Sequence, residues 1–308
     1  MTDKALASEA RAVAPRRRPI QPGRVLAWAA LITVLALSLF PFLWMIRTAL
    51  STTKSLATDP YSLLPVDFTW GAFQRVLGFS SPAQAIAEGG SGASVNFWVY
   101  LRNSLIYSTV VTIGQVFFGS MAAYAFARLR WPGRDKVFAL FLGALLVPPI
   151  FTSLPNFILV KNLGLLNTMP GLILPTFLMT PFAIFFLRQF FLGISREIEE
   201  AAQLDGAGHW RTYFRIILPM STAPIATLAI LTFIGTWNDY FWPLLVGGTD
   251  DSRVLTVALG VFRSQTPQGS PDWAGLMAAT LIAALPVLIL FFSFGKQVIN
   301  SIGYSGSK

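Results

Sequence analysis

The residues whose types and spacing could do chemistry lie in one charged stretch between two long apolar stretches. An acid and two small residues are followed after three positions by a glycine, and after nine more by an apolar group ending in proline. Alanines beside a glycine turn suit close docking into a groove on a partner protein rather than bond making. The docking residues are Glu200, Ala201, Ala202, Asp205, Gly206, Ile216, Leu218 and Pro219.

Catalysis and metal binding have little support elsewhere in the chain. There is no cysteine and a single histidine, His209, so disulfides, thiolate chemistry and histidine-based metal clusters are excluded. A membrane-embedded enzyme would need a nucleophile with a base, or a set of metal ligands. We therefore expect no catalytic residue, no metal site and no enzymatic activity on this chain.

The charged stretch, residues 194–219, is predicted to form two short helices joined by a bend. Ser195 is suited to cap the first helix, and the acids that follow it lie where a helix dipole favours negative charge. Gly206 supplies the bend because glycine adopts left-handed backbone angles freely. Asp205 is placed to cap the second helix through its side chain. The alternative interpretation is a solvated amphipathic loop with ordinary capping.

Composition indicates a membrane protein. Of the 308 residues, 54% are hydrophobic and 12% are charged, whereas soluble domains carry about 25% charged residues. Uncharged stretches of 18 or more residues can cross a hydrocarbon core of about 30 Å as helices. We predict an all-α membrane protein with six transmembrane helices. The stretches are 25–46, 103–127, 137–160, 162–187, 216–238 and 273–295.

The net charge of +9 is explained by topology and not by nucleic acid. With a cytoplasmic N-terminus, sixteen Lys and Arg residues lie inside and seven outside. The inside residues are six in the N-terminal tail, four in each of the loops 128–136 and 188–215, and two after residue 295. The positive-inside rule then places both termini in the cytoplasm.

The first apolar stretch could be a cleaved secretory signal or a membrane anchor. Signal peptides have an apolar core of about 7–15 residues and a small-residue cleavage site. The stretch 25–46 is longer and bulky throughout, so we interpret it as an anchor helix. Arg16-Arg17-Arg18 could be a twin-arginine address, but flanking charge for the anchor is the favoured explanation.

The chain divides into a tail, a membrane domain and a second tail. Residues 1–24 are predicted to be a disordered basic cytoplasmic tail, 25–300 the transmembrane domain, and 301–308 a cytoplasmic tail. The external segment 47–103 has a polar centre, 80–95, that reads as a flexible loop. Small residues at Gly119, Ala123 and Ala127 predict a close helix–helix contact.

Prolines interrupt the later spans, and broken helices are tolerated at membrane depth where they line a cavity or lie within protein.

In the fifth span, Thr232, Thr236 and Asp239 share one helix face, with Asn238 beside them. They are candidates to line a translocation path. Asp239 could instead cap a helix or contact another subunit near the external surface. A secondary transporter is the alternative, but mid-span charges that would form its ion sites are missing.

Further runs resemble the permeases of carbohydrate importers. They lie in the order found in that family, cover about residues 95–300, and accompany the docking pattern, which resembles the EAA motif of bacterial ABC importers. The runs are Asn103-Ser104-Leu105, Ala122-Ala123-Tyr124-Ala125-Phe126-Ala127-Arg128, Leu163-Gly164-Leu165-Leu166-Asn167-Thr168, Trp237-Asn238-Asp239-Tyr240-Phe241-Trp242-Pro243-Leu244-Leu245 and Leu285-Pro286-Val287-Leu288.

The resemblance is to the smaller permease subunit of maltose-type importers, and it implies a MetI-like fold in the bacterial plasma membrane. It also implies a second permease, two ATPase subunits and an extracellular solute-binding protein, with surrounding membrane lipid. ATP and Mg²⁺ would bind the ATPases, and no cofactor is expected on this chain. Half of a path for a di- or oligosaccharide is the implied function. Glycerol-phosphate or polyol import is the alternative.

Overall fold

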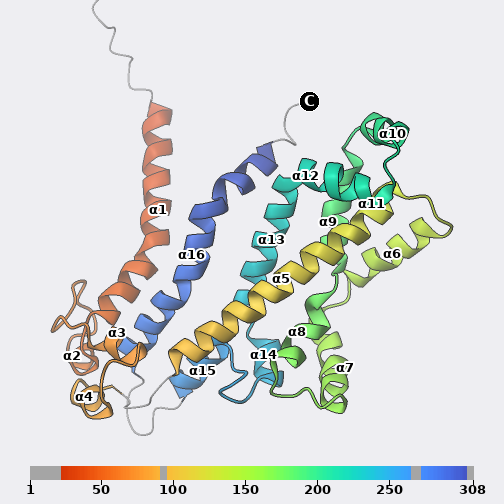
Figure 1. Ribbon diagram of the computed structural model, residues 1–308. Coiled ribbons are helices and arrows are strands. Elements are labelled where there is room, and N and C mark those ends of the chain that lie inside the picture. The colour runs from red at the N-terminus through yellow and green to blue at the C-terminus, as the bar shows by residue number, and fades with distance from the viewer. Residues whose placement is uncertain (1–21, 91–95, 265–271, 304–308) are drawn as a thin grey trace, which may run out of the picture. The chain divides into compact units, whose positions relative to one another are not determined.

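The computed structural model describes residues 22–90, 96–264 and 272–303, in which all regular structure is helical (Figure 1). Residues up to Met45 and residues from Ile46 onward form two compact units. In the first unit, α1 (Pro22–Ala49) is an apolar helix whose side chains are exposed along most of its length. It begins three residues before the predicted boundary; the remainder of the predicted tail lies outside the described residues.

The predicted spans correspond to three continuous helices and three bent pairs. The continuous spans are α1, α5 (Phe97–Arg128) and α16 (Trp273–Gly303). Each bent pair counts as one span by length and composition. The pairs are α6 (Arg134–Ala144) with α7 (Pro149–Asn162) at 98°, α8 (Met169–Phe177) with α9 (Pro181–Leu192) at 43°, and His209–Met220 with α13 (Thr222–Trp237) at 79°.

Prolines mark two of the bends, as expected. Pro149 is the first residue of α7 and Pro181 the first residue of α9. Proline has no N–H to donate and fits the first turn of a helix, where the N–H needs no partner within the helix. The chain therefore leaves one helix before each proline and starts another at it.

Helix α5 is the centre of the second unit, with its most extensive contacts to α9 and α13. A Cβ built at Gly119 would lie 2.9 Å from the Cβ of Ala183 in α9, closer than packed carbons approach. Ala123 and Ala127 are buried in the same contact, together with Leu187. The predicted close approach along this small-residue stripe is confirmed, and α9 is the partner helix.

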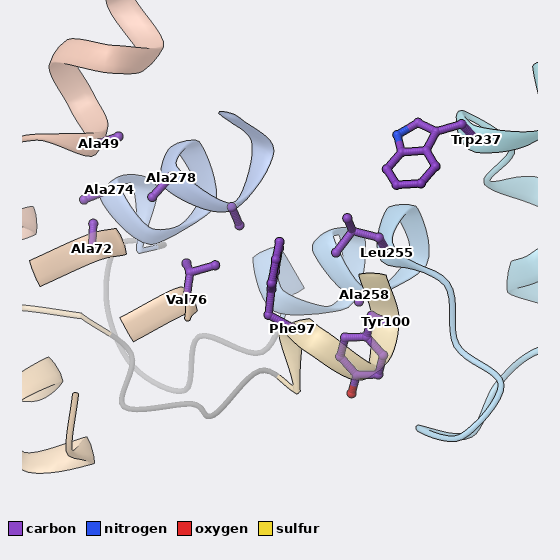
Figure 2. Close-up of a cluster of buried hydrophobic side chains, with 11 residues drawn as sticks. Ala49, Ala72, Val76, Phe97, Tyr100, Trp237, Leu255, Ala258, Ala274 and Ala278 are labelled. Carbon is purple, nitrogen blue, oxygen red and sulfur yellow. The ribbon is translucent and has the colours of Figure 1, made fainter. Parts of the chain in front are cut away.

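A buried cluster joins residues of six helices near the first turns of α5 (Figure 2). Phe97 and Tyr100 of α5 pack with α15 (Leu255–Ser264), with the first turns of α16 and with α3 (Gly71–Val76). The indole N–H of Trp237, at the end of α13, donates to the Ala283 carbonyl in α16 (3.2 Å). This end of the unit is therefore a packed core, and alanines of α16 allow its helices to approach closely.

The segment before α5 is folded, so the prediction of a flexible loop over 80–95 is wrong for its described part. It contains α2 (Thr53–Thr58), α3 and α4 (Pro82–Ala87). Helix α4 begins with a capping box: the Ser81 hydroxyl accepts from the Gln84 N–H, and the Gln84 side chain accepts from the Ser81 N–H. Capping stabilises this short helix despite its glycine-rich surroundings.

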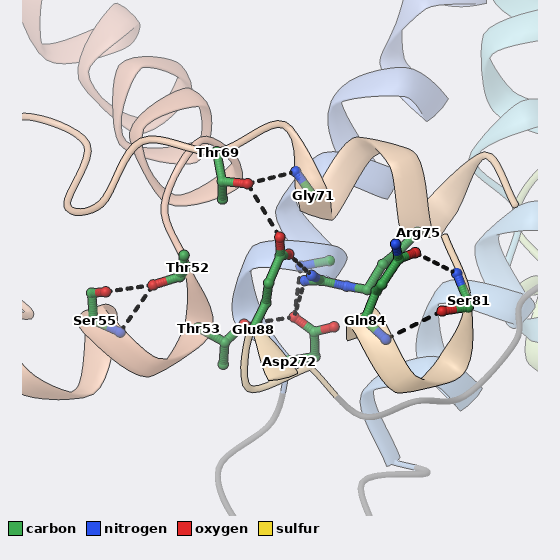
Figure 3. Close-up of polar contacts among 11 residues, drawn as sticks. Thr52, Thr53, Ser55, Thr69, Gly71, Arg75, Ser81, Gln84, Glu88 and Asp272 are labelled. Carbon is green, nitrogen blue, oxygen red and sulfur yellow. Dashed lines mark hydrogen bonds and ion pairs between the residues drawn. The ribbon is translucent and has the colours of Figure 1, made fainter. Parts of the chain in front are cut away.

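An ionic cluster ties this segment to the start of α16 (Figure 3). The Arg75 guanidinium contacts the Glu88 carboxylate at 2.6 Å and the Asp272 carboxylate at 3.2 Å. Thr53 donates to the same Asp272 oxygen (3.0 Å), and Thr69 donates to Glu88 (3.4 Å). The carboxylate of Asp272 is thus surrounded by donors, which compensates for its burial.

Candidate functional site

The first helix of the docking stretch, α10 (Arg196–Leu204), forms as its sequence predicts. The Ser195 hydroxyl caps it by accepting from the N–H of Glu197 (3.3 Å). Gly206 has φ of +80°, and the N–H of Ala207 donates to the Ala202 carbonyl (2.9 Å). Glycine is needed at this left-handed position because a side chain there would be strained. The predicted cap and bend are confirmed.

The second helix differs from the prediction at its start. α11 (His209–Thr212) is preceded by Gly208 and has no side-chain cap. Asp205 instead ends α10, where its N–H donates to the Ala201 carbonyl (3.1 Å). The prediction that Asp205 caps the second helix is wrong, because the glycine turn puts three residues between it and the first residue of that helix.

The second helix changes from an α-helix to a wider π-helix before the chain bends toward α13. α11 runs into a π-helix, η1 (Tyr213–Ile217), and then α12 (Leu218–Met220). The N–H of Leu218 donates to the Tyr213 carbonyl, five residues back. Pro219 explains the widening, since it cannot donate to the carbonyl four residues before it and its ring would clash there.

One face of α10 is buried and the other is exposed. Glu199 and Ala202 are buried against the rest of the chain. Glu200, Ala201 and Leu204 are exposed, and Leu204 is 91% accessible. Glu199 therefore stabilises the fold, whereas Glu200 is free to contact a partner together with the exposed side chain of Leu204.

The buried acid pairs with an arginine that the sequence interpretation did not single out. The Arg128 Nε lies 2.9 Å from the Glu199 Oε1, with both side chains almost inaccessible. The Nε–H of Arg128 does not point at the Glu199 Oε1, so the contact is an ion pair rather than a hydrogen bond. The sequence did contain an indication of this role, because Arg128 is the first charged residue after the 103–127 apolar stretch.

Arg128 also holds the end of α9. Its Nη2 donates to the Phe191 carbonyl and to the Ile194 carbonyl (2.6 Å). Phe191 lies in the last turn of α9, where carbonyls have no N–H partner four residues further along the helix, and Ile194 follows the end of that helix. One guanidinium, at the last turn of α5, therefore connects α5, α9 and α10.

The second helix is fixed to α5 independently. The Tyr213 hydroxyl is 2.7 Å from the Ser120 hydroxyl, and its ring lies 5.2 Å from that of Tyr124. Ile217 is fully buried in the same core, while Ile216 and Leu218 are half-buried and Pro219 is exposed. The docking stretch is therefore a rigid attachment to α5 at both of its helices.

The candidate path residues lie toward the opposite end of α13. Thr232 and Thr236 are half-buried, and Asn238 is exposed with its amide donating to the Ile234 carbonyl (2.9 Å). Asp239 makes its contacts within the chain: Tyr107 donates to it (3.0 Å), and Thr256 donates to its carbonyl (2.7 Å). That these residues line a path stays a prediction.

Asp239 also lies two residues before α14 (Phe241–Val246), and its carboxylate accepts from the Trp242 N–H at 3.4 Å. In the described part of the chain no group of acidic or histidine residues is arranged to hold a metal.

The chain belongs to the family of binding-protein-dependent transport system inner membrane components, whose model matches residues 115–302. Members of this family are permease subunits that work with partner transport components in the inner membrane, and they are not themselves enzymes. The match includes α10, Gly206 and the turn at Pro219.

Three relatives illustrate the range of the family. The diacetylchitobiose uptake permease NgcG of Streptomyces coelicolor is 31% identical, covering 90% of this chain and 85% of that protein. The trehalose/maltose permease MalG of Thermococcus litoralis is 30% identical, covering 91% and 95%. The sn-glycerol-3-phosphate permease UgpE of Yersinia pestis is also 30% identical, covering 88% and 93%.

A solved structure confirms the fold. The crystal structure of a bacterial ABC transporter involved in importing the acidic polysaccharide alginate matches with a TM-score of 0.74. The match covers 89% of this chain and 95% of that chain, at 22% sequence identity. The all-α ABC permease fold expected from the sequence is thereby confirmed.

Proposed function

We propose that this chain forms half of the translocation path of an ATP-driven importer for a di- or oligosaccharide. A second, homologous permease supplies the other half, and a solute-binding protein delivers the sugar. Two ATPase subunits bind ATP and Mg²⁺ and dock on the exposed face of α10. The observation that carries this proposal is the rigid attachment of that exposed face to α5.

The attachment supports a mechanical role. Closure of the ATPase dimer displaces α10, and the Arg128–Glu199 pair passes this displacement to α5 and α9. Packed elements move as rigid bodies rather than deforming continuously. The result is alternating access without any bond being made on this chain.

A neutral sugar fits the candidate path better than an anion does. The relatives' names include several sugars and one phosphate ester. Helix α13 carries no charged residue, and Thr232 and Thr236 would offer hydroxyls to a sugar. A phosphate is recognised by cations, so glycerol-phosphate import would require the second permease to supply them.

Reconstitution of the chain with its partner permease, ATPase and binding protein tests this proposal. We expect uptake of a labelled oligosaccharide that requires both ATP and the binding protein. Thr236→Trp should reduce uptake while the complex still assembles, because a large ring would enter the path. Uptake without the ATPase, or a preference for glycerol 3-phosphate over every sugar, would contradict the proposal.

A further inference from the structure

A basic pocket lies beside the docking stretch, between the end of α5 and the start of α6. Its volume is about 510 Å³, and Arg130, Arg134, Lys136 and Arg196 line it. Asp135 is the acid among its lining residues, and it pairs with Arg134 (2.9 Å). Within the described ranges no acid pairs with the other three cations. The pocket thus has one acid for four cations, and three of the cations have no counterion within it.

The turn between the two helices builds one wall of the pocket. Gly133 has φ of +83° and directly precedes α6, so the chain reverses sharply and α6 starts with its charged first turn. Arg134 donates to the Leu129 carbonyl (3.4 Å), which holds its side chain against the turn. Trp131 also lines the pocket and packs on Phe126 at 5.5 Å.

The position of the pocket along α6 places it at the level of lipid headgroups. One and two turns further along the same helix, Val137 and Leu140 are exposed, the latter at 73%. Exposed apolar residues on a membrane helix face lipid tails, and tryptophan is enriched at the interface directly beyond them. The cations therefore stand where a phosphodiester would be, with a surface for its acyl chains immediately adjacent.

We propose that this pocket binds the phosphodiester headgroup of an anionic phospholipid. Basic pockets between membrane helices are a recognised form of site for such headgroups. A docked ATPase is the competing occupant, but its expected contact is the exposed face of α10, and an ATPase surface would not cover the apolar residues of α6. The inference uses the membrane location of the chain and not the identity of its substrate.

Native mass spectrometry of the purified transporter complex tests the site. The probes are phosphatidylglycerol and phosphatidylcholine with identical acyl chains. We expect phosphatidylglycerol to be retained preferentially. Arg134→Gln with Lys136→Gln should weaken its retention about 25-fold, since each cation near a membrane surface contributes about fivefold. Asp135→Asn should instead strengthen retention about fivefold, an increase that misfolding cannot produce.

Lys161→Gln is the matched control, because Lys161 is an exposed cation at the end of α7, away from this pocket. It should leave retention unchanged. The headgroup proposal is overturned if excess inorganic phosphate displaces the lipid completely, which would make the site one for free anions. It is equally overturned if the double variant retains phosphatidylglycerol but loses the ATPase, which would make the pocket an ATPase contact.

Discussion

At the scale of single residues, one guanidinium connects the docking helix to the membrane helices. Arg128 contacts the Glu199 carboxylate and the carbonyls of Phe191 and Ile194, and its side chain is almost fully buried. Breaking a buried ion pair by removing one member leaves the other charge uncompensated. All three contacts therefore depend on one side chain, and a single substitution removes them together.

Replacing Arg128 by glutamine should lower the free energy of unfolding by about 3–5 kcal/mol, since Glu199 would stay buried without its partner. Thermal unfolding of the purified chain in detergent measures this loss. Arg130→Gln is the control, because Arg130 is exposed and its loss should change stability by about 0.5 kcal/mol or less. Equal losses of the free energy of unfolding in the two variants would show that the Arg128–Glu199 ion pair does not hold α10.

In the docking stretch, the sequence identified the residues of the spacing pattern but not the buried acid Glu199. The spacing around Glu200 and Gly206 identified the stretch, its cap and its bend. Glu199 could not be distinguished from its neighbour, because which acid faces inward depends on how α10 sits on α5. That contact joins residues 71 positions apart, and no local pattern encodes it.

At the scale of elements, the helices of the second unit approach each other at glycines. A Cβ at Gly114 in α5 would overlap the backbone carbonyl of Phe177 in α8, which cannot move aside as a flexible side chain could. At Gly143 in α6 a Cβ would meet nothing within 4 Å. Both glycines lie in helices and have the same low helix propensity, but only Gly114 is packed so closely that a side chain does not fit.

Gly114→Ala should destabilise the chain by about 1–3 kcal/mol through overpacking. Gly143→Ala should be neutral or stabilise it by up to about 1 kcal/mol, since alanine is the better helix former. Thermal unfolding of both variants under identical conditions is the measurement. A stabilising effect at Gly114 would mean that α5 and α8 are not in the contact described.

The elements themselves were largely predictable, since charge-free stretches gave the spans and prolines gave two bends. The folded segment before α5 was not. Its capping box at Ser81 and Gln84 is a short signal within a polar, glycine-rich stretch, and was interpreted as loop. Its ionic cluster joins Arg75 to Asp272, 197 positions apart, so the pairing exists only in the folded chain.

At the scale of the whole molecule, the positive-inside rule gives an orientation that can be measured directly. The loops 128–136 and 188–215 carry eight of the Lys and Arg residues and meet at the same end of α5 through Arg128. Accessibility tags at the N-terminus, near residue 132 and near residue 205 should report the cytoplasm. Tags near 86 and 250 should report the outside. An external position for 205 would contradict both the orientation and the ATPase contact.

The central claim is that α10 and its glycine bend couple this permease to an ATPase. Gly206→Pro forbids the left-handed backbone angles found there and tilts the two short helices relative to each other. Glu200→Lys reverses charge on the exposed face, where a like-charge contact can cost several kcal/mol. Gly208→Ala is the control, since Gly208 has φ of −75° and open space around it.

The most direct test is ATP hydrolysis stimulated by the binding protein, measured on complexes purified through the partner permease together with the amount of ATPase retained. We expect both Gly206→Pro and Glu200→Lys to reach the membrane with the partner permease but to lose the ATPase or its stimulation, while Gly208→Ala behaves as wild type. Full retention and full stimulation in both variants would contradict the assignment of this stretch as the coupling element.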